Sequence, residues 1–95
     1  MRIWAYSTRR ATMEIYYTHR AREDFRKLPK EVQKRVAAKM RFYAAQKDPL
    51  VFAKRLANFQ EGEFRFRAGD YRIFFDVARN KIFVLKIARR DKAYG

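Results

Sequence analysis

The sequence predicts an α+β fold in which an N-terminal strand and a two-helix hairpin precede a three-stranded antiparallel meander, with both helices on one face of a small sheet. Three observations lead to this prediction. A β-prone run is followed by two segments with the apolar periodicity of helices. Three runs of alternating basic and apolar residues come last, joined by links so short that they require antiparallel hairpins. A chain of 95 residues has room for one core, and therefore for one domain.

The first half of the chain supplies a strand and a short helix. The residues from Glu14 to Tyr17 are β-prone, and Thr18 is a suitable N-cap for the helix that follows. Within that helix Ala21, Phe25 and Leu28 recur at i, i+4 and i+7, which places them on one face.

A second amphipathic helix follows Pro29, a residue tolerated at the first helical position. Its apolar stripe consists of Val32, Val36, Met40 and Tyr43. An Asp-Pro pair at positions 48 and 49 ends it. The conformation of the connector from Leu50 to Ala57 is not predicted.

The meander is predicted at Glu63 to Arg67, Tyr71 to Val77 and Ile82 to Ala88. A two-residue link between the first two strands would place odd residues of one strand opposite even residues of the next. Arg65, Arg67 and Arg72 would then share one face, and the aromatic residues would face the helices. A three-residue link would bury Arg72 among phenylalanines, at a cost of several kcal/mol for an unpaired charge. We therefore predict the two-residue link; the last hairpin is apolar on both faces, and its parity stays open.

Composition limits the kinds of partner and chemistry. The chain carries 24 Lys and Arg against 10 Asp and Glu, a net charge of +14, which favours a polyanionic partner. Arginine on a sheet face binds phosphate through two parallel hydrogen bonds, so RNA is the first candidate. The absence of cysteine excludes disulfides, thiolate metal sites and a cysteine nucleophile. No apolar run approaches the length of a membrane span, and neither helix has the wide apolar face of an interfacial helix.

The first twelve residues are set apart from the rest. Residues Met1 to Thr12 hold three arginines and no acid, and Met13 opens the first strongly strand-like run. We therefore predict an N-terminal extension of unclear status at 1–12 and a single domain at 13–95.

The order of elements, with LPKEVQKRV at the second helix and GDYRIFFDV before a terminal RRDKAY, resembles the RelE/ParE family of small toxins from toxin–antitoxin pairs. The resemblance covers Met13 to Gly95 and is strongest to the RelE branch, whose members are ribosome-dependent endoribonucleases that cut messenger RNA. It implies a cytoplasmic toxin that acts on the ribosome and its messenger, needs no metal or cofactor, has no membrane partner and is neutralised by a cognate antitoxin. Two alternatives stay open: a ParE-like inhibitor of DNA gyrase that is not a nuclease, and a basic nucleic-acid-binding module without catalysis.

The resemblance also implies site residues. The catalytic positions correspond to Arg65, Arg72, Arg90 and Tyr94. Further RNA contacts are expected from Arg67, Lys86, Arg89 and Lys92. Arg89 stands where many relatives have histidine, which argues against proton transfer by a histidine at that position. Structural alternatives exist for four of these residues: an ion pair of Arg72 with Asp70 or Asp76, solvated charges on the sheet face for Arg65 and Arg67, and packing of Tyr94 as a terminal aromatic.

Metal-independent cleavage of RNA requires removal of the 2′-hydroxyl proton, stabilisation of a charged phosphorane and protonation of the leaving 5′-oxygen. The usual histidine pair is impossible, because His19 is the single histidine and lies far in sequence from the arginines. In the arginine-based solution, Arg65 and Arg72 clamp the scissile phosphate. Arg90 lies near the leaving oxygen, and Tyr94 acts as base or stacks on a nucleotide.

Overall fold

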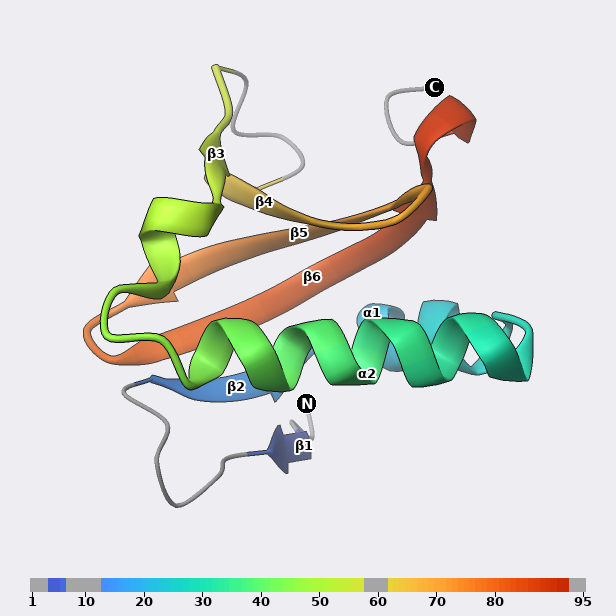
Figure 1. Ribbon diagram of the computed structural model, residues 1–95, viewed down its shortest axis with the longest axis horizontal. Helices are drawn as coiled ribbons and strands as arrows, with labels where there is room; N and C mark the ends of the chain where they lie inside the picture. Colours follow the sequence, from blue (N-terminus) through green and yellow to red (C-terminus); the bar gives the residue numbers. More distant parts are fainter. Residues whose placement is uncertain (1–3, 7–12, 58–61, 93–95) are drawn as a thin grey trace.

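A computed structural model of the chain describes residues 4–6, 13–57 and 62–92. In chain order its elements are β1 (Trp4–Tyr6), β2 (Glu14–Tyr17), α1 (His19–Arg26), α2 (Lys30–Ala44), the 3-10 helix η1 (Pro49–Phe52), β3 (Lys54–Arg55), β4 (Phe64–Ala68), β5 (Tyr71–Ala78), β6 (Lys81–Arg89) and the 3-10 turn η3 (Arg90–Lys92). The strands form one sheet in the order β1-β2-β6-β5-β4-β3 (Figure 1). The strands β2 and β6 pair in parallel, and all other neighbours pair antiparallel.

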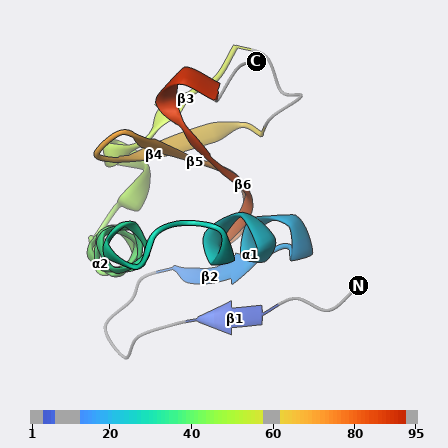
Figure 2. The ribbon, with the colours of Figure 1, turned by 90° about the vertical axis from the view of Figure 1, so that its right-hand side faces the viewer.

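The predicted α+β architecture is confirmed. Figure 2 shows the sheet curving from β1 and β2 through β6 to β5 and β4, with both helices on the inner side of the curve. The sheet is larger than predicted, since two short strands extend it. One is β1, which lies in the predicted N-terminal extension and pairs with β2, and the other is β3, which lies in the connector. In the described part of the chain, no helix is long and apolar enough to cross a membrane.

The core lies between the helices and the inner face of the sheet. The predicted stripe of α2 is confirmed: Val36, Met40 and Tyr43 are buried, and Val32 packs against them. Opposite the stripe, Phe66 stacks between the rings of Tyr43 and Phe75, with centroid distances of 4.1 and 4.3 Å. Aromatic stacking thus joins α2 to β4 and β5, and contributes roughly 0.5–1.5 kcal/mol per pair beyond the buried area.

The β4–β5 hairpin has the predicted two-residue link. Ala68 pairs with Tyr71 across a turn of Gly69 and Asp70. Gly69 has a φ of +62°, a left-handed conformation that glycine adopts without strain. The turn therefore fixes the register that places Arg67 directly opposite Arg72.

The β5–β6 hairpin contains an irregularity that the sequence did not reveal. Phe74 pairs with Lys86 but Phe75 pairs with Val84, so Leu85 is an extra residue in β6. The bulge reverses the alternation of β6 partway along the strand. This explains why both faces of β6 look apolar in the sequence and why its parity could not be predicted.

Helix α1 covers the edge of β6 that β2 leaves open. Pairing of β2 with β6 ends at Tyr17 and Val84. Beyond it the hydroxyl of Thr18 donates to the Leu85 carbonyl at 3.3 Å, and the carboxylate of Asp24 accepts from the Ile87 amide at 3.1 Å. Thr18 also accepts from the Ala21 amide, which confirms it as the N-cap of α1. Side chains of α1 thus replace a missing strand neighbour.

We expect Asp24→Ala to lower the free energy of unfolding by about 1.5–3 kcal/mol, because a charge-assisted hydrogen bond is lost and the Ile87 amide stays buried without an acceptor. Urea denaturation measures the change. The matched control is Glu23→Ala, which removes an exposed ion pair with Arg26 worth at most about 1 kcal/mol. Equal effects of the two substitutions would contradict the edge-capping role of Asp24.

Candidate functional site

The face of the sheet that points away from the helices carries a group of cations, which we call the outer face. Cross-strand pairing places Arg67 opposite Arg72, and Lys54 opposite Arg65. The row that contains Lys54 and Arg65 continues through Phe74 on β5 to Lys86 on β6. The members of the outer face that bear on function are Lys54, Arg65, Arg67, Arg72, Phe74 and Lys86. The prediction that Arg65, Arg67 and Arg72 share one face is therefore confirmed by the register.

Two of these cations are held firmly in the sheet. Arg72 is 5% exposed and its Nη1 donates to the carbonyls of Gly69 and Tyr71, both at 3.4 Å. Lys86 is 8% exposed, and its Nζ lies 5.4 Å from the centre of the Phe74 ring. Carbonyl oxygens and a ring face offset part of the desolvation cost of these charges. The positive charge at the centre of the outer face is therefore fixed in position.

Arg65 and Arg67 have no carboxylate partner among the described residues, so their charges can interact with a ligand. The Nε of Arg65 is buried, and no described residue accepts a hydrogen bond from it. Arg67 is exposed, and its backbone carbonyl accepts a hydrogen bond of 2.7 Å from the Tyr43 hydroxyl, which ties β4 to α2. The ion pairs found within residues 4–6, 13–57 and 62–92 join Arg20 to Asp24, Arg26 to Glu23 and Arg89 to Asp91. Neither Arg65 nor Arg67 is neutralised by an internal carboxylate in that part of the chain.

Arg90 comes to the same end of the sheet as Arg72. Its backbone amide donates to the Asp70 carbonyl at 2.7 Å, which ties η3 to the β4–β5 turn. The Arg35 side chain of α2 passes the same turn, because a Cβ added at Gly69 would lie 3.3 Å from its Nη1. Arg35 lies outside the apolar stripe predicted for this helix, and its approach to the turn was not predicted.

The remaining predicted residues are Arg89, Lys92 and Tyr94. Arg89 pairs with Tyr71, on the opposite face from Arg72, and its Nε lies 3.5 Å from an Asp91 carboxylate oxygen. Lys92 ends η3, and Tyr94 lies outside the described residues. The roles predicted for these three residues stay predictions.

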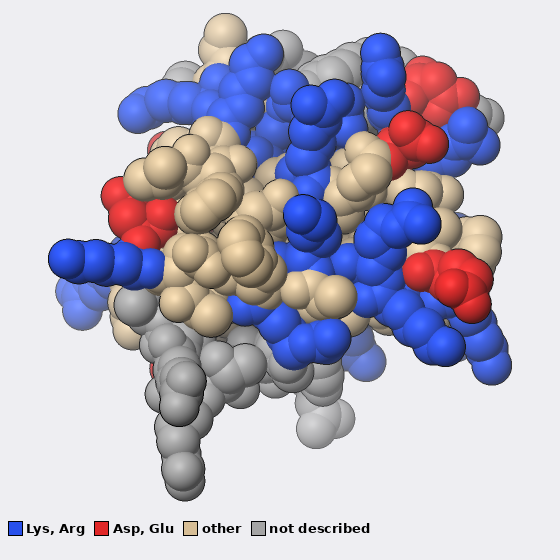
Figure 3. All heavy atoms as spheres, in the orientation of Figure 1, with Lys and Arg blue, Asp and Glu red and all other residues tan. Residues whose placement is uncertain are grey.

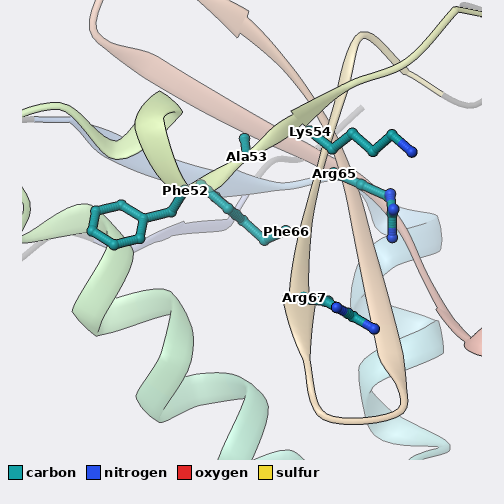
Figure 4. A pocket seen from close by; sticks show the side chains of 6 residues that line it. All are labelled: Phe52, Ala53, Lys54, Arg65, Phe66 and Arg67. Atoms are coloured by element: carbon teal, nitrogen blue, oxygen red, sulfur yellow. The ribbon is translucent and has the colours of Figure 1, made fainter.

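A cavity of about 210 Å³ lies at the edge where the two-residue strand β3 stops short of the end of β4. Its lining consists of Phe52, Ala53, Lys54, Arg65, Phe66 and Arg67 (Figure 4). In Figure 4 the three cationic side chains lie on one side of β4, and the two phenylalanines lie on the other. Lys54 was not predicted as part of this site, because a two-residue strand has no detectable periodicity.

The wider surface of the molecule also carries many positive charges. In Figure 3 basic side chains spread over the upper and right-hand parts of the visible face, interrupted by a few acidic residues. In Figure 1 the upper part of this view shows β3, β4 and the β4–β5 turn, and the right-hand part below it shows α2. A surface of this kind attracts a polyanion from solution.

The described residues include cations that can stabilise negative charge, but none of them is an obvious general base. His19 is exposed at the start of α1. Burial raises the pKa of Tyr43, and a hydrogen bond to the Glu14 carboxylate raises the pKa of Tyr16, so both phenols stay protonated at neutral pH. Within the described part of the chain, no three His, Asp or Glu side chains gather closely enough to hold a metal ion. The outer face can bind and polarise a phosphate group.

Comparison with known proteins gives the family. Residues 15–94 match the family model for the ParE toxin of the type II toxin–antitoxin system parDE. The chain belongs to the ParE toxin family. The resemblance to RelE/ParE toxins inferred from the sequence is thereby confirmed. The matched region begins within β2, so β1 lies outside it.

A solved structure supports the fold of this ParE-family toxin. The toxin–antitoxin complex RelBE2 from Mycobacterium tuberculosis contains a chain that is similar with a TM-score of 0.68 and 24% sequence identity. The alignment covers 84% of this chain and 99% of that chain. No curated protein sequence matches the chain.

We expect Tyr43→Phe to lower the free energy of unfolding by about 1 kcal/mol at neutral pH, because the hydrogen bond to the Arg67 carbonyl is lost while the ring stack remains. Burial raises the pKa of Tyr43 in the folded state above its unfolded value of about 10. The contribution of the hydroxyl is therefore complete below about pH 10 and is lost as the pH rises through the folded pKa. Urea denaturation of both proteins from pH 7 to 11 measures the difference, and a difference that grows with alkalinity would contradict this assignment.

Proposed function

We propose that this toxin is a ribosome-dependent, metal-independent endoribonuclease that cuts messenger RNA and so arrests translation. The observation that supports the proposal is the shared outer face of Arg65, Arg67 and Arg72, with Arg90 anchored at its end. Guanidinium groups stay charged at physiological pH and bind phosphate oxygens in pairs. Their convergence fits a site for one phosphodiester and its neighbours.

The reaction would be an in-line displacement within the RNA. The 2′-oxygen forms a bond to the phosphorus, and the bond from phosphorus to the 5′-oxygen breaks, which leaves a 2′,3′-cyclic phosphate and a 5′-hydroxyl. The 2′-hydroxyl proton is removed and a proton is delivered to the leaving oxygen. Arg65 and Arg72 would stabilise the added negative charge on the phosphorane, and Arg90 would lie beside the leaving oxygen. Tyr94 would serve as base or stack on a nucleotide.

Because the site has no clear general base or general acid, another factor would have to lower the reaction barrier. Orientation of reacting groups accounts for roughly 7–11 kcal/mol of a barrier. The ribosome, which holds the messenger in the decoding site, would supply that orientation in the cytoplasm. Cleavage of free RNA should accordingly be feeble.

Inhibition of DNA gyrase is the second candidate, and the match to the ParE family model favours it. The same fold and the same basic surface would serve a toxin that acts by binding and without chemistry. The two functions differ in a simple measurement: growth arrest with intact messengers and accumulating DNA breaks indicates gyrase, whereas truncated messengers on ribosomes indicate the nuclease.

The protein partner expected of a type II toxin is its cognate antitoxin, and the similar RelBE2 structure is a toxin–antitoxin complex. For this chain, with a net charge of +14, an antitoxin segment rich in Asp and Glu would be complementary. A small neighbouring reading frame with an acidic segment would support this pairing.

The nuclease proposal predicts that Arg72→Ala combined with Arg90→Ala abolishes translation arrest. Loss of charge stabilisation at two positions should reduce message cleavage by about 10³-fold or more. Primer extension on translating ribosomes measures the cleavage. Cutting of messages at the wild-type rate by the double variant would refute the proposal.

Two controls accompany this experiment. Arg22→Ala removes an exposed arginine of α1 on the helix side and should leave cleavage unchanged. Because Arg72 is buried, circular dichroism must show that the double variant is folded, and Arg90→Ala alone provides an exposed single change at the same site.

A further inference from the structure

The cavity between β3 and β4 lies next to the arginines proposed to hold the scissile phosphate, yet no role has been assigned to Lys54 within it. Its volume of about 210 Å³ is below the roughly 300–1,000 Å³ of sites that enclose a whole small molecule. A cavity of this size fits one charged group of a longer ligand.

The charges on its lining indicate the sign of that group. Three of the six lining residues are cations, Lys54, Arg65 and Arg67, and the other three are apolar. The lining contains no carboxylate, and no described acid forms an ion pair with these three cations. In Figure 4 their side chains lie on the same side of β4, so they can act on one anion.

Arg65 provides an independent reason to expect a ligand. Its Nε is buried beside the cavity and lacks an acceptor among the described residues. A buried donor without a partner is unfavourable, and a small shift of the Arg65 side chain toward the cavity would let an anionic oxygen satisfy it. A guanidinium has five donors, so Arg65 can contact two neighbouring phosphates at once.

The sheet sets the spacing between the cavity and the scissile site. Arg72 lies on β5, Arg65 on β4 and Lys54 on β3, and neighbouring strands are about 4.8 Å apart. Arg65 pairs with both Lys54 and Phe74, and Phe74 lies two residues from Arg72 along β5. Two strand spacings and two residues therefore separate Lys54 from Arg72, about 12 Å between their Cα atoms. One phosphate held between Arg65 and Arg72 leaves Lys54 free for the next.

We propose that Lys54, with Arg65 and Arg67, forms a second phosphate subsite that binds the phosphodiester next to the scissile one on a single-stranded RNA. The inference rests on the proposed nuclease function, because the grouping of arginines with Lys54 on the outer face is what favours RNA over an acidic peptide. Lys54 binds and positions the strand and does not touch the reacting atoms.

The test is the salt dependence of binding to a fluorescent, ten-nucleotide 2′-O-methyl RNA, which cannot be cut because its 2′-oxygen is blocked. The full-length chain is titrated by fluorescence anisotropy over a series of KCl concentrations. One lost phosphate contact to a single strand makes the slope of log K against log salt shallower by about 0.7. Lys54→Ala should show this change, and Lys54→Arg should keep the wild-type slope.

Lys34→Ala is the matched control, since it removes an exposed lysine of α2 that lies outside the cavity. It should leave the slope unchanged. The proposal is overturned if wild type does not bind the RNA, if Lys54→Ala keeps the wild-type slope, or if Lys34→Ala loses as much. It is also overturned if Lys54→Ala weakens binding of poly-glutamate but not of RNA, which would assign the cavity to an acidic protein.

The outcome is separable from that of the nuclease proposal. Failure of wild type to cut messages on ribosomes would remove the nuclease function and leave the slope change at Lys54 as evidence of RNA binding. Normal cutting with an unchanged slope in Lys54→Ala would remove the subsite alone.

Discussion

The register of the β4–β5 hairpin determines both the core and the candidate functional surface of this toxin. A turn of two residues, Gly69 and Asp70, places Ala68 opposite Tyr71 and so assigns every side chain of both strands to a face. On the inner face Phe66 completes an aromatic stack with Tyr43 and Phe75. A shift of one residue would exchange the faces, with arginines in the core and phenylalanines in water. The burial of the aromatic residues and the display of the arginines are consequences of the same constraint.

Cations on the outer face differ in how firmly they are held, and the difference matches the roles proposed for them. Arg72 and Lys86 are buried and contact carbonyls or a ring, which fixes their charge in the sheet. Lys54 and Arg67 are exposed at the sheet edge. A fixed charge is suited to a reacting phosphate whose geometry matters, and exposed charges are suited to holding the rest of an RNA strand. Arg65, partly buried with an unsatisfied donor, lies between the two groups.

The sequence contained enough information for the architecture and for the shared face of Arg65, Arg67 and Arg72. Both follow from local periodicity and from the steric requirement of a short turn. It did not contain the bulge at Leu85, which depends on how β6 meets β5, or β3, which is too short to have a pattern. The approach of Arg35 to Gly69 and the capping of Ile87 by Asp24 join distant parts of the chain. Such contacts arise from packing, so the shared face of the arginines could be predicted from the sequence, but the other residues that lie near it could not.

The edges of the sheet have a consequence for the behaviour of the protein at high concentration. The outermost strands, β1 and β3, have three and two residues, and the open stretch of β6 is covered by α1. Among the described strands, none offers another molecule a long row of unpaired amides and carbonyls on which to build a shared sheet. Each copy of the chain has a net charge of +14, and the resulting repulsion between copies also disfavours such a shared sheet. These features disfavour the growth of fibrils from a small protein rich in strands and aromatic residues. Strand β1 contributes to this effect, because it pairs with the edge of β2 that would otherwise be open.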